Sequence, residues 1–411
     1  MKKKRKKIKY KNILIIVVVV VLAIILFRKK EEKEIITADM IDSYIGKNIT
    51  ELENFTHEKN LIVNKTFEYS KTISKDDIID VEFKDNQVDV IISKGVIDDN
   101  LYREKNVNEL GNVPIMMYHG IVDTIDNKYT GGNVDKNGYN RTAKAFRDDL
   151  EFYYQNGYRM IRLNDYVNGI IDVPLGYSPI ILTFDDGDKN NFNVLGKNAD
   201  GSLNIDPNSA VGILEEFKKK YSDFNVTATF FVMDGIFNQS EYNSEIVNWL
   251  VEHGYDVGNH TTIHPDFTTI SINKTQEVVG KMYQKLDELL PDKYVKIVAL
   301  PYGSPYKKTH DNFAYILNGS IDGYEYHTES TLRVGWEPEL SPFHKNFDKT
   351  FLKRCRAYDN NGKEFDIKMV FTNLEKKRFI SDGDIDTIVI KEGDNNINSD
   401  LNNIITYKES D

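Results

Sequence analysis

Residues 179–187 read Pro-Ile-Ile-Leu-Thr-Phe-Asp-Asp-Gly, a short apolar run that a proline opens and an acidic glycine turn closes. A continuous apolar run of this length with turn signals on both sides is typical of a strand buried on both faces, as in a parallel sheet. Functional residues of such sheets stand at the carboxyl ends of the strands. Asp185 and Asp186 stand at this end, so the stretch indicates both the fold class and the position of a site.

The same kind of apolar run recurs along the chain, alternating with helical patterns. Further strands are predicted at 114–119, 160–161, 229–232, 256–259 and 297–300, and helices at 142–156, 209–221, 244–253 and 272–290. Alternating strands and helices predict an α/β fold in which helices cover a parallel sheet. Over residues 113–350 we expect a distorted or partly closed (β/α) barrel, with an open sheet as the alternative.

Two more polar clusters follow predicted strands. The first is Asn-His-Thr-Thr-Ile-His at 259–264, and the second is Leu-Pro-Tyr-Gly at 300–303. Each cluster alone has an ordinary explanation, because paired histidines are common and proline with glycine often ends a strand. Because the carboxyl ends of parallel strands share one edge, these clusters should lie beside Asp185 and Asp186. Two imidazoles and one carboxylate form a three-ligand metal site that leaves positions open for water and substrate.

These three clusters, in this order, resemble the first three motifs of the NodB-type polysaccharide deacetylases (carbohydrate esterase family 4). The resemblance spans about residues 113–350. It implies a distorted (β/α) barrel that removes N- or O-acetyl groups from polysaccharides with one divalent metal ion. The implied metal ligands are Asp186, His260 and His264. Zinc is the first expectation for these donors, while cobalt, nickel and iron also suit them.

The resemblance also implies roles for residues that do not bind the metal. Asp185 falls at the position of the catalytic base. Pro301 and Tyr302 fall at the substrate side of the third motif, where the backbone N–H of Tyr302 would help to bind the oxyanion. Such a donor contributes roughly 3 kcal/mol to transition-state binding when it is aimed correctly.

Two positions depart from the family pattern. Ala299 stands where the third motif normally has the arginine that orients the base, and Arg333 is the candidate replacement from a later strand. The general-acid histidine near the end of the domain is not evident. His119, in Met-Tyr-His at 117–119, is predicted to supply the acid instead, as in the rearranged subgroup that resembles the exopolysaccharide deacetylases. His344 is the alternative.

The amino terminus predicts a membrane anchor. Residues 1–12 form a basic tail, and residues 13–27 form an unbroken apolar run that Arg28-Lys29-Lys30 follows. A cleaved signal peptide is the alternative, but the run lacks a small-residue cleavage site. The positive-inside rule places the basic tail in the cytoplasm and the rest of the chain outside a bacterial cell membrane.

Between the anchor and the barrel, residues 35–96 predict a small α+β domain. A helix at 49–59 precedes strands at 61–63, 78–83 and 88–92. This order resembles a PASTA domain, a family associated with recognition of peptidoglycan, and a plain spacer is the alternative. Residues 351–411 predict a carboxyl-terminal extension with a helix at 351–358 and a strand at 387–390. No motif in this extension indicates a role.

The charge of the chain excludes some partners. With 53 Lys and Arg against 64 Asp and Glu, the formal net charge is −11. Because eleven of those 53 basic residues and none of the 64 acids fall within positions 1–30, residues 31–411 carry −22. This charge argues against nucleic acid as a partner. The single cysteine, Cys355, excludes an intramolecular disulfide and a four-thiolate zinc site.

Together these features predict a surface-anchored enzyme that deacetylates N-acetylated polysaccharide of the cell envelope, with peptidoglycan as the first expectation and an exopolysaccharide as the alternative. An esterase that removes O-acetyl groups would use the same residues. A non-catalytic wall-binding or sensing protein with a degenerate barrel is a further alternative, which Ala299 favours and the intact Asp185 and metal ligands oppose.

Overall fold

The computed structural model describes residues 36–70, 72–125, 139–360, 363 and 366–409. The chain forms two compact units, Met1–Asp98 and Asp99–Asp411. The predicted basic tail and anchor, residues 1–12 and 13–27, lie outside the described residues. Within the described part of the chain, no helix is long and apolar enough to cross a membrane.

The first unit has the predicted α+β order. Its elements are α2 (Ala38–Asp42), α3 (Ile49–Lys59), β1 (Ile62–Ser70), β2 (Ile78–Lys84) and β3 (Gln87–Val96). Asn48 caps α3 by accepting a hydrogen bond from the backbone N–H of Thr50, which satisfies one of the free donors of the first turn. The sheet order is β1-β3-β2, with β1 parallel and β2 antiparallel to β3. Helix and strand positions therefore confirm the prediction, and β1 is longer than expected.

The second unit is built on an eight-stranded sheet. Its order is β16-β13-β12-β11-β8-β4-β17, and β7 also pairs with β8. The strands are β4 (Ile115–Tyr118), β7 (Tyr158–Met160), β8 (Ser178–Phe184), β11 (Thr229–Val232), β12 (Asp256–Asn259), β13 (Ile297–Ala299), β16 (Ser330–Leu332) and β17 (Cys355–Arg356). Neighbouring strands are parallel throughout. Every residue of β8 is buried, as the apolar run predicts.

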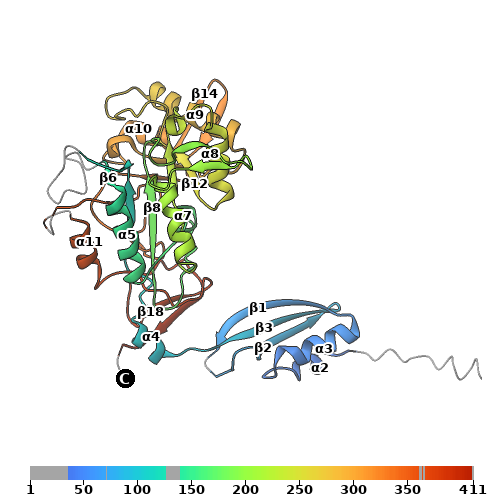
Figure 1. Cartoon of the computed structure of the whole chain (residues 1–411). Helices are drawn as coiled ribbons and strands as arrows, with labels where there is room; N and C mark the ends of the chain where they lie inside the picture. The colour runs from blue at the N-terminus through green and yellow to red at the C-terminus, as the bar shows by residue number, and fades with distance from the viewer. Residues whose placement is uncertain (1–35, 71, 126–138, 361–362, 364–365, 410–411) are drawn as a thin grey trace, which may run out of the picture. The chain divides into compact units, whose positions relative to one another are not determined.

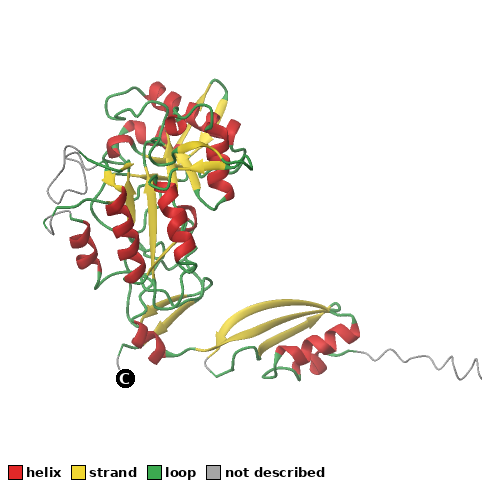
Figure 2. Ribbon diagram, viewed as in Figure 1, coloured by secondary structure: helices red, strands yellow, loops and turns green. Residues whose placement is uncertain are grey.

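Helices cover this sheet, and Figure 1 shows α5 and α7 alongside β8. The helices are α4 (Asp99–Lys105), α5 (Ala143–Gln155), α6 (Leu163–Val167), α7 (Ala210–Lys220), α8 (Asn243–Glu252), α9 (Ile272–Leu289), α10 (Asp311–Leu317) and α11 (Ile367–Leu374), with short 3₁₀ helices η1 (Ile236–Asn238) and η2 (Pro301–Gly303). Ser209 caps α7 as predicted, because its hydroxyl accepts from the backbone N–H of Gly212. Figure 2 shows helices packed around the strands of this unit.

Shorter strands pair in two-stranded sheets outside the main sheet. They are β5 (Ile121–Val122), β6 (Arg141–Thr142), β9 (Val194–Lys197), β10 (Leu203–Ile205), β14 (Asn318–Ile321), β15 (Tyr324–His327), β18 (Ile388–Lys391) and β19 (Ile404–Tyr407). β18 confirms the strand that was predicted at 387–390.

The two ends of the main sheet approach each other. Isolated bridges join Leu332 to Leu352 and Trp336 to Cys355, so the chain after β16 lies beside the chain at β17. This curvature agrees with a distorted barrel and not with an open sheet.

The predicted boundary at residue 350 is wrong, because β17 belongs to the main sheet and pairs with β4. The helix predicted at 351–358 is absent for the same reason. Leu352, Arg354 and Cys355 are fully buried in this segment. An extended backbone lets them fill the space between the sheet's two ends, so tertiary packing overrides the local helical pattern.

Candidate metal and catalytic site

Three of the predicted metal ligands meet at the carboxyl edge of the sheet. Asp186 follows β8, and His260 and His264 follow β12. One donor atom from each of the three lies within 4.8 Å of the others. The Oδ1 atom of Asp186 is 3.2 Å from Nε2 of His260 and 3.5 Å from Nε2 of His264. The sequence-predicted triad is therefore assembled.

Observations at His260 test whether this triad fits a metal ion. Its Nδ1 lies 2.8 Å from the carbonyl oxygen of Ala299, and donating to that carbonyl leaves the lone pair on Nε2. Nε2 is buried and, with its lone pair, faces Oδ1 of Asp186 at 3.2 Å without a hydrogen bond between them. Two acceptors that face each other inside a protein are costly unless a cation lies between them. Two imidazoles and a carboxylate are also the donor set of divalent transition metals, so the residues fit such an ion.

The turn after β8 brings two adjacent aspartates into one site. In a regular strand Asp185 and Asp186 would face opposite ways. Here the chain leaves the strand at once, because Asp186 has φ 73° and Gly187 has φ 60°. Glycine suits this position, since a Cβ atom on Gly187 would lie 3.0–3.2 Å from Val232. The second carboxylate therefore joins the two imidazoles of the predicted metal site while the first remains beside them.

Asp185 forms a buried, two-pronged ion pair with Arg354. Nη1 of Arg354 donates to Oδ1 at 2.7 Å, and Nη2 donates to Oδ2 at 2.6 Å. Asp185 is 2% exposed and Arg354 is fully buried. Burial raises the pKa of Asp185, but the charge of Arg354 outweighs it and holds the pKa well below its usual range. Asp185 is therefore ionised at neutral pH and held in one orientation.

Arg354 occupies the role that the sequence assigned to Arg333, so that assignment is wrong. The guanidinium of Arg333 lies over the ring of Phe351, with 5.6 Å between its Cζ and the ring centroid. Only the backbone carbonyl of Arg333 takes part, by accepting a hydrogen bond from Nε of Arg354 at 3.1 Å. Arg354 lies in the segment before β17, where no motif marked it.

Ala299 does not leave Asp185 without a partner. The carbonyl of Ala299 orients His260, and the arginine that the third motif lacks comes from the segment that leads into β17. The departure from the family pattern therefore concerns which strand provides the arginine, and the Asp–Arg pair itself is present.

His119 lies where the predicted acid should lie. It follows β4, and its Nε2 is 3.9 Å from Oδ2 of Asp185. The ring is 8% exposed and packs edge-on against Tyr139 with 5.0 Å between ring centroids. Burial lowers the pKa of His119 to about 4. The alternative, His344, lies in a turn where its Nδ1 accepts from the backbone N–H of Asn346, and it does not line the cavity at the triad.

A cavity of 390 Å³ opens over the triad. Its lining includes His119, Asp185, the three predicted ligands, Tyr302 and Tyr306. Tyr302 sits in η2 after Pro301, has φ 57°, and places its ring 4.5 Å from that of His264. The side chains of Tyr302 and Tyr306 are 54% and 60% exposed, so the rim of the cavity offers two aromatic rings to a ligand. We refer to this space as the catalytic cavity.

Comparison with known proteins agrees with this site. The family model described as polysaccharide deacetylase matches residues 173–316, which hold the three polar clusters. An uncharacterized 30.6 kDa protein of Geobacillus stearothermophilus, from the 3′ region of fumA, is 31% identical over 124 residues. That match covers 30% of this chain and 38% of the relative.

The solved structures that this chain resembles include two deacetylases. The Streptococcus pyogenes deacetylase PplD, in complex with acetate, is 17% identical with a TM-score of 0.44, over 63% of this chain and 97% of that one. The peptidoglycan deacetylase PdaC of Bacillus subtilis is 22% identical with a TM-score of 0.24, over 35% and 58% of the two chains. Since both scores are low, the family assignment rests on the sequence match. Residues 173–316 of the second unit therefore match the polysaccharide deacetylase family, a family of hydrolases.

Proposed function

We propose that this protein removes acetyl groups from N-acetylated sugars of cell-envelope polysaccharide, with peptidoglycan as the substrate and a divalent metal ion, zinc first, as the cofactor. One observation carries the proposal. An ionised carboxylate, Asp185, is held by Arg354 directly beside a carboxylate–imidazole–imidazole triad in a cavity with an aromatic rim. This is the arrangement that metal-assisted hydrolysis requires.

Asp186, His260 and His264 would hold the metal ion. When bound, such an ion supplies Lewis-acid chemistry, because it lowers the pKa of water and polarises a carbonyl oxygen. Asp185 accepts the proton that the attacking water loses as the new carbon–oxygen bond forms. Arg354 keeps that carboxylate ionised and aimed.

His119 is proposed to donate a proton to the departing amine as the carbon–nitrogen bond breaks. The proton that Asp185 takes from water passes from its Oδ2 to Nε2 of His119, 3.9 Å away. His119 hands this same proton to the amine, so both side chains end each cycle as they began. The backbone N–H of Tyr302, in the turn that Pro301 begins, is proposed to donate to the developing oxyanion.

Acetate release decides between this function and its alternatives. The full-length protein, loaded with zinc, is incubated with peptidoglycan and with poly-N-acetylglucosamine, and acetate, new amines and new hydroxyls are measured. Amines in proportion to acetate support N-deacetylation. Hydroxyls in place of amines would instead indicate an O-acetyl esterase. Absence of acetate from both substrates would support the non-catalytic alternative, which the Arg354–Asp185 pair disfavours.

The location is proposed from the sequence. The basic tail at 1–12 and the apolar run at 13–27 would anchor the chain in a bacterial cell membrane with the deacetylase domain outside. The α+β unit, which resembles a PASTA domain, would bind the wall or hold the catalytic unit away from the membrane. Protease access to intact cells tests this orientation, because only an external domain is cleaved.

Removal of the metal should abolish acetate release. A chelator such as dipicolinate takes the ion from three ligands that form no closed cage, and the other catalytic groups then have no Lewis acid to act with. Activity should fall to the background rate and return when zinc or cobalt is added. Unchanged turnover in protein shown by elemental analysis to be free of metal would exclude the proposed role of the triad.

Replacing each histidine in turn tests whether His119 or His344 is the general acid. His119→Ala should lower kcat about 10²- to 10⁴-fold, the usual contribution of a general acid. His344→Ala is the control and should retain full kcat, since His344 does not line the catalytic cavity. The reverse result would assign the acid to His344.

A further inference from the structure

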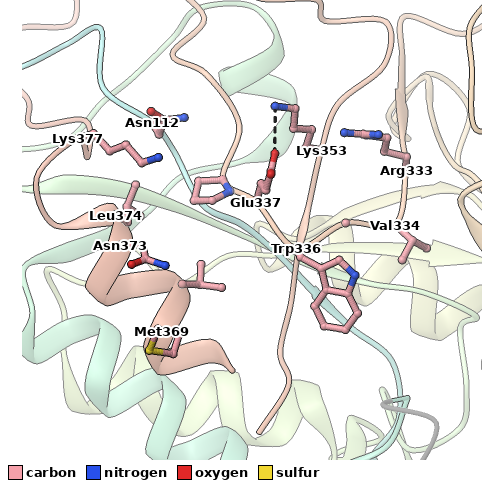
Figure 3. A pocket seen from close by; sticks show the side chains of 13 residues that line it. Asn112, Arg333, Val334, Trp336, Glu337, Lys353, Met369, Asn373, Leu374 and Lys377 are labelled. Atoms are coloured by element: carbon pink, nitrogen blue, oxygen red, sulfur yellow. Dashed lines mark hydrogen bonds and ion pairs between the residues drawn. The ribbon is translucent and has the colours of Figure 1, made fainter. Parts of the chain in front are cut away.

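A second and larger cavity, of 880 Å³, lies between the chain that follows β16 and helix α11. Figure 3 shows its lining, with Lys377 and Asn112 on one side and Arg333 on the other. All of its lining residues belong to the second unit. The predicted catalytic residues and metal ligands are absent from this lining, so the proposed reaction does not explain this cavity. We refer to it as the α11 cavity.

The α11 cavity is positively charged although the chain as a whole is acidic. Three cations, Arg333, Lys353 and Lys377, face one acid, Glu337. Lys353 and Glu337 partly neutralise each other, with 3.5 Å between Nζ and Oε2 (Figure 3). Two positive charges therefore remain in the lining of a chain whose net charge is −11. A concave surface that concentrates one sign of charge attracts ligands of the other sign.

The two remaining cations still have donors to offer. Nε of Arg333 is buried and makes no hydrogen bond with a described residue. The ammonium of Lys377 forms no ion pair with any residue that the structure describes. A planar guanidinium matches the oxygens of a carboxylate or a phosphate, and an ammonium adds a point charge. The polar part of the cavity therefore suits an anion.

The rest of the lining suits a sugar ring. Trp336, Met369 and Leu374 provide apolar surface, while the side-chain amides of Asn112 and Asn373 provide donors and acceptors. Binding sites for small polar molecules combine such apolar surface with a few placed polar groups. An indole ring suits the less polar face of a pyranose, and side-chain amides suit its hydroxyls.

The α11 cavity adjoins the catalytic cavity. Val334 lines both. Arg356, which lines the catalytic cavity, has its guanidinium 4.8 Å from the ring centroid of Trp336. Val334 and the arginine–tryptophan pair therefore lie at the boundary between the two cavities, as neighbouring units of one polymer would require.

We propose that the α11 cavity binds an acidic sugar unit of the polysaccharide, with a carboxylate or phosphate held by Lys377 and the ring held against Trp336. Arg333, on the other side of the cavity, adds to the positive potential that attracts the anion. The identity of the ligand as part of the substrate rests on the proposed function. Binding in this cavity selects chains that carry an acidic group next to the unit that is deacetylated.

Tryptophan fluorescence tests the proposal without measuring catalysis. The chain has two tryptophans, and Trp249 stacks on His253 away from the cavity, with 3.7 Å between ring centroids. In the full-length protein, Trp249→Phe leaves Trp336 as the reporter. Glucose, glucuronate and glucose 6-phosphate serve as probes, because they share a ring and differ at carbon 6. One acidic probe should quench Trp336 with a Kd at least tenfold below that of glucose.

Charge reversal at Lys377 then tests whether the probe binds in the α11 cavity. Lys377→Glu should weaken binding of the acidic probe about tenfold and leave binding of glucose unchanged. Added salt should weaken binding of the acidic probe and not that of glucose. Lys293→Glu, an equal charge change at an exposed site outside both cavities, should have no effect. Preference for glucuronate assigns a carboxylate, and preference for glucose 6-phosphate assigns a phosphate.

Other outcomes overturn the inference. These are equal quenching by glucose, no quenching by any probe, or the same response in the Lys377 and Lys293 variants. Acetate release without quenching would reject this inference and keep the proposed function. Binding of the acidic probe by a protein that releases no acetate would reject the proposed function and keep the acidic binding site.

Discussion

Asp185→Asn should reduce acetate release by about 10³-fold while the purified protein keeps its metal ion. Removal of a general base typically lowers the rate 10²- to 10⁴-fold. The amide has the shape of the carboxylate and still accepts a hydrogen bond from Arg354, but it cannot take a proton from water. Metal content should not change, since the proposed ligands are Asp186, His260 and His264. Single-turnover acetate release and elemental analysis measure the two quantities.

A matched substitution controls for the loss of a buried charge. Asp256 in β12 is also 2% exposed and also pairs with an arginine, Arg162, but it does not line the catalytic cavity. Asp256→Asn should lower the melting temperature and leave kcat within about twofold. If Asp185→Asn retained more than a tenth of the wild-type kcat, Asp185 would not be the base.

Arg354→Met should produce the second large loss. Asp185 would remain buried without its partner, and breaking a buried ion pair costs about 3–5 kcal/mol of stability. Burial already raises the pKa of Asp185, and without the guanidinium the largest opposing effect is lost, so this pKa rises. A larger fraction of Asp185 is then protonated at a given pH. We expect kcat to fall about 10²-fold, and the acid limb of the kcat/KM profile to move to higher pH.

The ion pair between Asp185 and Arg354 should also make the stability of the wild-type protein depend on pH. Because the folded-state pKa of Asp185 is depressed, the pair contributes stability above the unfolded pKa, and this contribution is lost as the pH falls. Denaturation followed from pH 7 down to pH 3 should therefore lose less stability in Arg354→Met than in the wild type.

Two variants distinguish the effect of Arg354 on the orientation of Asp185 from its effect on the stability of the fold. Arg354→Lys keeps the charge and loses the two-pronged geometry, so it should retain the wild-type pH limb with an intermediate kcat. Arg162→Met leaves the buried Asp256 without its half-exposed arginine partner and should cost stability with kcat unchanged. A normal pH profile and kcat in Arg354→Met would show that Arg354 is only structural.

Local sequence predicted much of the fold because the signals were short-range. The apolar run at 180–184 became the fully buried β8, and the helical periodicity at 209–221 became α7 with its Ser209 cap. Periodicity and caps depend on neighbouring residues only. The end of the domain was mispredicted because the segment around Leu352 follows tertiary packing and not its own helical pattern.

The same distinction between local signals and tertiary packing applies to the site. Asp186, His260 and His264 were predictable, because the topology of a parallel sheet brings the ends of its strands to one edge. His119 could be placed by the same rule, since it follows β4, the neighbour of β8. Arg354 was not predictable from any spacing, and Arg333 was chosen because it also follows a strand.

The amino-acid sequence by itself thus determined the α/β class, the edge at which the chemistry lies and the identity of the triad. Only the tertiary structure decided which arginine meets Asp185 and that the last part of the chain completes the barrel. The physical reason is distance along the chain. The ion pair between Asp185 and Arg354 forms only after β17 has docked beside β4. Along the chain, β17 lies more than a hundred residues from β8, the strand that Asp185 follows.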